Sequence, residues 1–304
     1  MKNDMKKVTI LHLITAAKNA SPFDVNMAFD AGFENIVPYT NITLNEVTGL
    51  TQDAIFSRSA SGQKSEAIFI GGRDIDLTMD MLEAAKKGTF PPFEISMFAD
   101  PSGAFTTGAA MVAKVEYHLK RHFNTNLKDK RVAVFGATGP VGGCIAVMAA
   151  KQGAHVELVA HSSLEDARNK ALAYNNRYDV SIGYVDGISD YAKKSVLDNA
   201  DVALCAAAAG IRVISAKQIA SSKTLKVVAD VNAVAPTGAE GVEVKMDGLE
   251  IADTKVLGIG ALAIGDLKYK TQHNMLKEML ETEKPLYLEF MAALEFARRL
   301  TQAS

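Results

Sequence analysis

The chain has 304 residues, more than the roughly 250–300 at which a single hydrophobic core usually stops growing, so two domains are expected. Hydrophobic residues make up 48% and charged residues 22%, which excludes disordered, collagen-like and coiled-coil classes. A net charge of -2 provides no bulk positive field for nucleic acid or an anionic membrane surface. Two cysteines, Cys144 and Cys205, are too few for a disulfide framework, and a reducing compartment is predicted.

The amino terminus imitates a signal peptide, because a basic leader at residues 1–7 precedes an apolar run at residues 8–17. His12 interrupts that run. The β-branched residues of the run favour a buried strand over residues 8–14. No apolar segment approaches the roughly 20 residues needed to span a bilayer. The sequence therefore predicts a cytoplasmic protein that binds neither a membrane nor nucleic acid.

Apolar strand-like runs alternate with amphipathic helical runs, which is typical of βαβ units and a mostly parallel sheet. In the first half, Ser21 and Pro22 favour a helix over residues 23–31, as a cap followed by proline at the first helical position. A further helix is expected over residues 75–87. Another, capped by Thr106 and Thr107, is expected to run through Lys120. The predicted strands cover residues 8–14, 35–39, 67–70 and 94–98.

The second half has the full doubly wound order. Its predicted strands cover residues 131–135, 156–160, 180–185, 202–205 and 227–230, and its helices cover residues 144–152, 164–177 and 190–199. Residues 258–265 are expected to form a glycine-spaced loop, with Asp266 capping the helix that follows. Residues 285–300 are predicted to form the last helix.

The predicted fold class is α/β, with an N-terminal α/β domain and a second, Rossmann-type domain. The first domain would span residues 1–125, completed by residues 271–304, and the second would span residues 126–270. The C-terminal helix is expected to pack back on the N-terminal domain.

A glycine-rich turn lies between the predicted strand 131–135 and the helix after it. Glycine there lets backbone N–H groups approach a pyrophosphate, and the helix amino terminus adds positive partial charge. The alternative, a tight turn without a ligand, is disfavoured by the surrounding βαβ pattern. The loop residues predicted to bind a dinucleotide are Gly136, Thr138, Gly139, Pro140, Val141 and Gly142.

The next strand end bears on which dinucleotide binds. An NAD-specific site usually carries Asp or Glu there, and residues 161–163 contain neither. His161, Ser162 and Ser163, with Arg168 from the next helix, could hold a 2′-phosphate instead. NADP is therefore predicted as the cofactor. The absence of arginine at the strand end leaves NAD use open.

The sequence shows no obvious pair of residues for general acid–base catalysis. The six histidines are scattered, and His118 and His122 fall at helical spacing on a face predicted to be solvated. No His, Cys, Asp and Glu spacing suggests a metal site. Direct hydride transfer between two bound cofactors requires geometry rather than a proton relay.

Two strand ends and one helix supply further candidates in the second half. Ala207, in the small-residue run after Cys205, could let a cofactor lie against the backbone or could serve tight packing. Asn232 could bind the nicotinamide amide or form a turn. Lys268 is predicted in the first turn of a helix, where a cation is unfavourable, and this marks it as a functional candidate.

One helix start in the first half offers a substrate contact. Phe23 presents an aromatic face, and Asp24 a carboxylate whose alternative role is favourable first-turn charge.

The chain resembles the methylene-tetrahydromethanopterin dehydrogenases of methylotrophic bacteria over nearly its whole length. The matching strings are Ser-Pro-Phe-Asp-Val at 21–25, Leu-Thr-Gln-Asp at 50–53, Ile-Phe-Ser-Arg at 55–58, Ile-Phe-Ile-Gly-Gly at 68–72, Phe-Ala-Asp-Pro at 98–101, Phe-Thr-Thr-Gly-Ala-Ala-Met-Val-Ala at 105–113, Asp-Val-Asn-Ala-Val at 230–234 and Gly-Ile-Gly-Ala-Leu-Ala at 258–263.

The resemblance implies that a hydride passes from the methylene carbon of methylene-tetrahydromethanopterin to C4 of NADP, giving the methenyl derivative. Two flanking nitrogens would delocalise the developing cation, which accounts for the missing acid–base pair. The resemblance also implies that Lys268 lies near the reacting pterin as the catalytic residue, that Phe23 helps to hold the pterin with Asp24 bordering it, and that subunits associate as a homo-oligomer.

Three alternatives remain open: a methylene-tetrahydrofolate dehydrogenase, a shikimate-type dehydrogenase and a non-catalytic NADP-sensing protein. Two features bear on the cofactor. The loop Gly-Ala-Thr-Gly-Pro-Val-Gly is closer to the NADP-only branch of the family, yet His161 stands where that branch carries arginine.

Overall fold

The computed structural model describes residues 7–302, apart from the side chains of residues 60 and 61. Most of the basic leader, residues 1–6, therefore lies outside the described residues. The chain divides into two compact units. Unit 1 contains the described residues through Thr106 together with Lys270–Phe296, and unit 2 contains Thr107–Tyr269 together with the residues from Ala297 onward.

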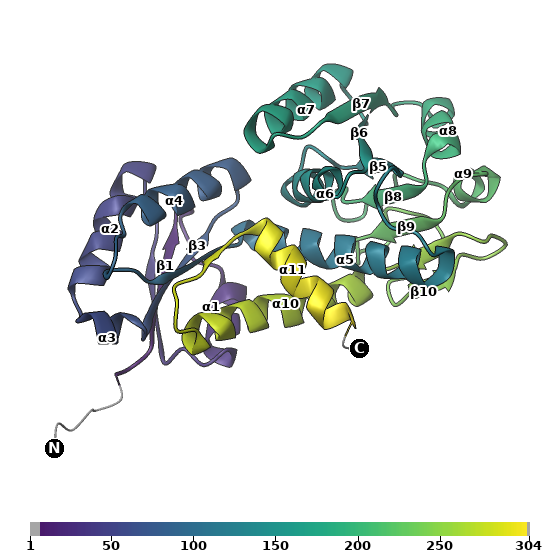
Figure 1. Ribbon diagram of the computed structural model, residues 1–304. Helices are drawn as coiled ribbons and strands as arrows, with labels where there is room; N and C mark the ends of the chain where they lie inside the picture. Colours follow the sequence, from purple (N-terminus) through teal and green to yellow (C-terminus); the bar gives the residue numbers. More distant parts are fainter. Residues whose placement is uncertain (1–6, 303–304) are drawn as a thin grey trace. The chain divides into compact units, whose positions relative to one another are not determined.

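Unit 1 is built on a parallel sheet of five strands in the order β12-β4-β3-β1-β2. Figure 1 labels two of these strands, β1 and β3. The strands are β1 (Ile10–Thr15), β2 (Asn35–Tyr39), β3 (Glu66–Gly71), β4 (Ser96–Ala99) and β12 (Tyr287–Leu288). The helices are α1 (Pro22–Asp30), α2 (Leu44–Phe56), α3 (Ala60–Gln63), α4 (Ile75–Lys87), the 3-10 turn η1 (Pro101–Gly103), and parts of α10 (Ala261–Glu281) and α11 (Phe290–Gln302).

The centre of this sheet is buried on both faces. Every residue of β3 and β4 is buried, as expected for inner parallel strands with helices on both sides. Phe69 and Phe98 meet edge to face across these strands, with ring centroids 5.2 Å apart. The predicted α/β architecture is confirmed, but residues 285–300 are not one helix, because β12 first adds an edge strand beside β4.

Helix α1 starts as the sequence predicts. Ser21 is its N-cap and accepts a hydrogen bond from the Asp24 amide, and Pro22 occupies the first turn. The start of α5 (Ala104–Phe123) differs from the prediction. The fully buried Asp100 carboxylate, rather than a threonine, accepts the amides of Phe105 and Thr106 and the Thr106 hydroxyl, at 2.9, 3.2 and 2.6 Å.

Unit 2 contains a seven-stranded sheet in the order β10-β11-β9-β8-β5-β6-β7, parallel except for β10. Its strands are β5 (Arg131–Phe135), β6 (His155–Ala160), β7 (Ile182–Asp186), β8 (Val202–Cys205), β9 (Val227–Asp230), β10 (Asp247–Glu250) and β11 (Leu257–Ile259). Its helices are most of α5, α6 (Pro140–Lys151), α7 (Leu164–Tyr178), α8 (Asp190–Asn199), α9 (Ala216–Ser221), the first part of α10 and the end of α11.

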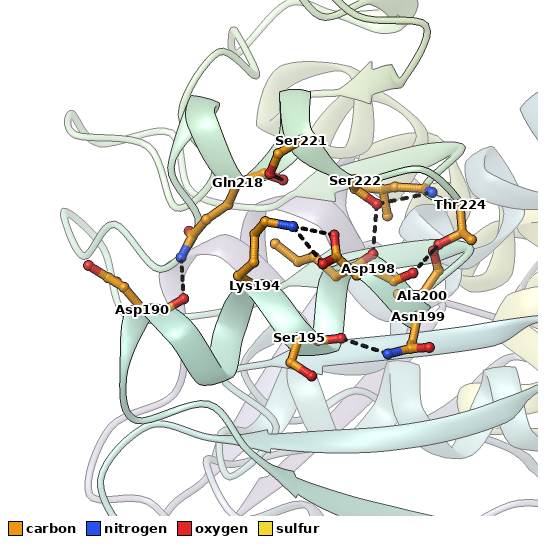
Figure 2. Close-up of polar contacts among 12 residues, drawn as sticks. Asp190, Lys194, Ser195, Asp198, Asn199, Ala200, Gln218, Ser221, Ser222 and Thr224 are labelled. Atoms are coloured by element: carbon orange, nitrogen blue, oxygen red, sulfur yellow. Dashed lines mark hydrogen bonds and ion pairs between the residues drawn. The ribbon is translucent and has the colours of Figure 1, made fainter.

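This strand order is that of a doubly wound dinucleotide-binding sheet, with the order reversing at β5. The predicted Rossmann-type fold of this part of the chain is therefore confirmed. Polar side chains complete the carbonyl end of α8 (Figure 2). The Ser222 hydroxyl donates to the Leu197 carbonyl at 2.7 Å, and the Thr224 hydroxyl donates to the Ala200 carbonyl at 2.8 Å. The Leu197 carbonyl also accepts the Ala200 N–H at 3.3 Å, so these hydroxyls supplement the backbone donor at the helix end.

A polar cluster of partly exposed Asp247 with Lys114 and buried His118 joins α5 to β10, and it contradicts the prediction that His118 is solvated. The His118 side chain is buried, its Nε2 lies 2.8 Å from Oδ1 of Asp247, and Nζ of Lys114 lies 2.7 Å from Oδ2. A Cβ at Gly248 would lie 2.1 Å from Cε1 of His118, so only glycine lets β10 pack this closely. The sequence suggested a solvated helix face because the edge strand that covers it comes 129 residues later.

The carboxyl group of Asp247 is acidified by this cluster. Partial burial raises its pKa, but hydrogen bonds from His118 and Lys114 and their positive charge outweigh burial and lower the pKa to about 2. A carboxyl group with a lowered folded-state pKa stabilises the fold above its unfolded-state pKa and loses that contribution as pH falls through the folded-state value.

We therefore expect Asp247→Asn to lower stability near pH 7 by no more than about 1 kcal/mol, because the carboxylate is half exposed and screened. The difference between variant and wild type should shrink as pH falls from about 4 to about 2. Urea unfolding midpoints measured across this range test it. A difference that stays constant with pH would contradict the electrostatic origin.

Candidate functional site

The turn between β5 and α6 is shaped by the absence of side chains. Gly136 has φ +78°, and a Cβ there would lie 2.4 Å from the Ala206 carbonyl oxygen beyond β8. A Cβ at Gly142 would lie 2.2 Å from the Gly136 carbonyl oxygen. Both positions therefore require glycine. Gly139 is different, because its Cβ would meet nothing closer than 3.4 Å, although the residue is the N-cap of α6.

Helix α6 begins at Pro140, four residues earlier than predicted, so its amino terminus lies inside the glycine-rich turn. Proline suits this first position because no intrahelical bond needs its missing N–H. Thr138 and Pro140 are exposed and Val141 is half-buried. A helix amino terminus with exposed neighbours and a close-packed backbone is the form of a phosphate-binding turn.

A cavity of about 410 Å³ lies beside this turn. It is lined by Thr138 from the turn and by His161, Ser162 and Ser163 from the connection between β6 and α7. The structure thus brings together four residues that sequence reasoning placed in one cofactor site. Arg168, the fourth residue suggested for the 2′-phosphate, is exposed on α7 and is not among the residues that line the cavity.

The polar atoms in this connection are partly committed to local structure. Ser163 is the N-cap of α7 and accepts the Asp166 amide at 3.1 Å. The Ser162 hydroxyl lies 3.3 Å from Nε2 of His161. His161 and Ser162 are both exposed, so their polar groups are accessible to a ligand.

The loop after β9 is organised by the buried carboxylate of Asp230. Its oxygens accept the amides of Asn232 and Ala239 at 3.0 and 2.9 Å. Burial raises the pKa of Asp230, and these backbone hydrogen bonds oppose the rise. Burial, together with the charge of Asp230, also raises the pKa of the Cys205 thiol, which makes that cysteine unreactive.

Asn232 and Ala207 occupy the strand ends where the sequence placed them. Asn232 is buried, and its amide accepts from the Val234 N–H at 2.9 Å and donates to the Pro236 carbonyl at 3.4 Å. The side chain therefore makes the turn that was the alternative to nicotinamide binding. Ala207, after β8, is half-buried.

The position of Lys268 was predicted wrongly. Helix α10 begins at Ala261, so residues 258–265 form β11 and the start of the helix rather than a loop, and Asp266 lies inside the helix rather than capping it. Lys268 is about two turns into α10 and half-buried, so it does not oppose the helix dipole. Gly260 serves packing, since a Cβ there would lie 2.1 Å from the Glu243 carbonyl oxygen, whereas a Cβ at Gly265 would meet nothing within 4 Å.

Phe23 and Asp24 are neighbours in α1 with different surroundings. The Phe23 side chain is 47% exposed, which leaves its ring available for contact. Asp24 is buried, and its Oδ1 accepts a hydrogen bond from Nε2 of the fully buried Gln272 at 3.0 Å. Asp24 therefore ties α1 to the part of α10 that belongs to unit 1.

Sequence reasoning missed Asp166 and Lys170 as cavity-lining residues. Their spacing of four residues on α7 could have shown that they share a face, but not which face meets the cavity. Across residues 7–302, no three His, Cys, Asp or Glu side chains are grouped as a metal site would need. Of the helices that the structure describes, none has the length and apolar character to cross a membrane.

Known proteins resemble this chain in sequence. The family model for the N-terminal part of methylene-tetrahydromethanopterin dehydrogenase matches residues 22–102. The NAD(P)-dependent methylenetetrahydromethanopterin dehydrogenase of Methylorubrum extorquens is 45% identical over 289 residues, covering 95% of this chain and 97% of that protein. The bifunctional protein MdtA of the same organism is 30% identical, covering 88% of this chain and 90% of that protein.

Solved structures support the fold. Shikimate 5-dehydrogenase from Listeria monocytogenes matches with a TM-score of 0.51 and 14% identity, covering 99% of both chains. Ornithine carbamoyltransferase from Pyrococcus furiosus matches with a TM-score of 0.54 and 10% identity, covering 91% of this chain and 86% of that one. At these identities the likeness shows the two-domain α/β fold alone. The sequence relatives decide the family: this chain belongs to the methylene-tetrahydromethanopterin dehydrogenases.

Proposed function

We propose that this protein oxidises methylene-tetrahydromethanopterin to methenyl-tetrahydromethanopterin with NADP or NAD, in one-carbon (formaldehyde) metabolism of the cytoplasm. The observation that carries the proposal is the 45% identity to an NAD(P)-dependent dehydrogenase of that name, over nearly the full length of both proteins. Unit 2 would be the dinucleotide-binding domain and unit 1 the pterin-binding domain. We further propose that the protein forms a homo-oligomer.

The residues at the β5–α6 turn fit a dinucleotide. Gly136 and Gly142 leave the backbone uncovered, and the amino terminus of α6 offers partial positive charge to a pyrophosphate. His161, Ser162 and Ser163 line the adjoining cavity, where an adenosine ribose would lie. A bound nicotinamide dinucleotide supplies the hydride acceptor.

The remaining side chains are assigned to orientation and electrostatics. Phe23 offers an exposed ring for a flat pterin, and Asp24 keeps the start of α1 in place through Gln272. Lys268 is assigned to orient the substrate and tune the local field. Ala207 and Asn232 shape the strand ends proposed to lie beneath the nicotinamide.

The first test is a spectrophotometric assay at the NADPH absorption band with methylene-tetrahydromethanopterin and methylene-tetrahydrofolate in parallel. We expect turnover with the first substrate and a lower KM for NADP than for NAD. Absence of NAD(P)H formation with both substrates would remove the dehydrogenase function and favour an NADP-sensing protein. A tenfold preference for NAD, about 1.4 kcal/mol, would reverse the cofactor preference.

Lys268→Ala is expected to lower kcat at least tenfold, about 1.4 kcal/mol in the barrier, because the charge is assigned to the reacting pterin. The dissociation constant of NADP should change less than twofold. Steady-state kinetics and a binding titration measure the two effects. Lys270→Ala, an exposed lysine of the same helix, is the matched control, and equal turnover in the Lys268 variant would make Lys268 an ordinary surface lysine.

Phe23→Leu and Asp24→Ala should distinguish a residue that contacts the substrate from one that stabilises the fold. The first removes an exposed ring, so we expect the KM for the pterin to rise several-fold with no loss of thermal stability. The second removes the hydrogen bond between Asp24 and Nε2 of buried Gln272, which costs about 1–3 kcal/mol of stability. A Phe23→Leu variant with unchanged KM and kcat would remove Phe23 from the site.

A further inference from the structure

Two charged residues on one face of α7, Asp166 and Lys170, line the cavity beside the glycine-rich turn. Residues 166, 169, 170 and 173 of the helix all face that cavity, as their spacing of three and four residues requires. Arg168 falls on a different side of the helix and is not among the lining residues. Lys170 is therefore the cation that α7 directs to this space.

The Lys170 side chain is positioned by an aromatic ring. Its Nζ lies 5.9 Å from the centroid of the Tyr174 ring, within the range of a cation–π interaction. Tyr174 is itself buried, and its hydroxyl donates to the Ala137 carbonyl in the glycine-rich turn at 3.3 Å. The lysine is thus connected through one ring to the turn proposed to bind the pyrophosphate.

Asp166 and Lys170 are four residues apart in a helix, a spacing that usually allows an ion pair. Among the described residues, however, no ion pair joins these two side chains. The Ser163 cap accepts a hydrogen bond from the backbone N–H of Asp166 and does not engage its carboxylate. One negative and one positive side chain therefore face the same cavity separately. Each remains able to meet a ligand group of opposite character.

We propose that Asp166 and Lys170 determine which dinucleotide binds. This inference rests on the proposed function for its choice of ligand. Lys170 contacts the 2′-phosphate of NADP, because its positive charge attracts the phosphate. The Asp166 carboxylate repels the same phosphate. The Asp166 carboxylate accepts a hydrogen bond from the free 2′-hydroxyl of NAD. In NAD-specific enzymes, a carboxylate at the neighbouring strand end accepts this hydrogen bond. The pair explains how one site without arginine or a carboxylate at residues 161–163 can accept both cofactors.

The test measures binding without any pterin. The full chain is titrated with NADPH and NADH by cofactor fluorescence, which no tryptophan obscures because the sequence contains none. Titration calorimetry with 2′,5′-ADP and 5′-AMP isolates the ribose from the nicotinamide. Lys170→Met retains an apolar stem over the Tyr174 ring and removes only the charge. Arg168→Met, the matched control, removes an equal charge from the same helix away from the cavity.

Lys170→Met is expected to weaken NADPH and 2′,5′-ADP about tenfold or more, and NADH and 5′-AMP less than twofold. Asp166→Asn should weaken NADH several-fold and leave NADPH as tight or tighter. Arg168→Met should change neither cofactor. Equal weakening of both cofactors by Lys170→Met, or an Asp166→Asn variant with an unchanged NADPH to NADH ratio, would overturn the inference.

The two proposals can fail separately. If the chain discriminates the dinucleotides as expected but oxidises no methylene pterin, the proposed function fails and the cofactor site stands. If the chain turns over the pterin with both dinucleotides and Lys170→Met leaves their dissociation constants unchanged, the function stands and Lys170 has no role in selection. Absence of binding by all four probes overturns both.

Discussion

Close backbone approach at the β5–α6 turn is the constraint on which the rest of unit 2 depends. Gly136 passes within contact of the Ala206 carbonyl, and Gly142 passes over the Gly136 carbonyl, so a single added carbon would push strand ends and helix apart. This packing brings the α6 amino terminus to the end of the sheet. It also brings the Ala137 carbonyl within reach of Tyr174, which connects the turn to α7. The placement of α6 and the shape of the turn proposed to bind phosphate therefore have one physical cause.

Buried carboxylates shape the strand ends of both units. Asp100 after β4 satisfies the first amides of α5, and Asp230 at the end of β9 satisfies two amides of its loop. In each case a short acidic side chain replaces water as the partner of backbone N–H groups that the fold buries.

Charge is used locally in this nearly neutral protein. Lys114 and His118 fasten an edge strand through Asp247, whereas Asp166 and Lys170 face a cavity unpaired with each other. The first arrangement pairs these side chains with each other, although the buried Nδ1 of His118 has no hydrogen-bond partner among the described residues. The second leaves opposite charges accessible to a ligand, which is the arrangement expected at a binding site rather than in a structural contact.

The sequence by itself determined the α/β class, the bounds of β5, β8 and β9 and the glycine-rich turn, because local hydrophobic period and glycine spacing encode them. It also determined the bounds of β2, α4 and α8. Long-range packing decided several other features. The cover over His118 comes from β10, and the edge strand β12 completes a sheet begun at the other end of the chain. Lys268 lies inside α10, which begins directly after Gly260, where the backbone packs closely against Glu243. Which side of α7 faces the cavity also depends on residues distant in sequence, and no local pattern records it.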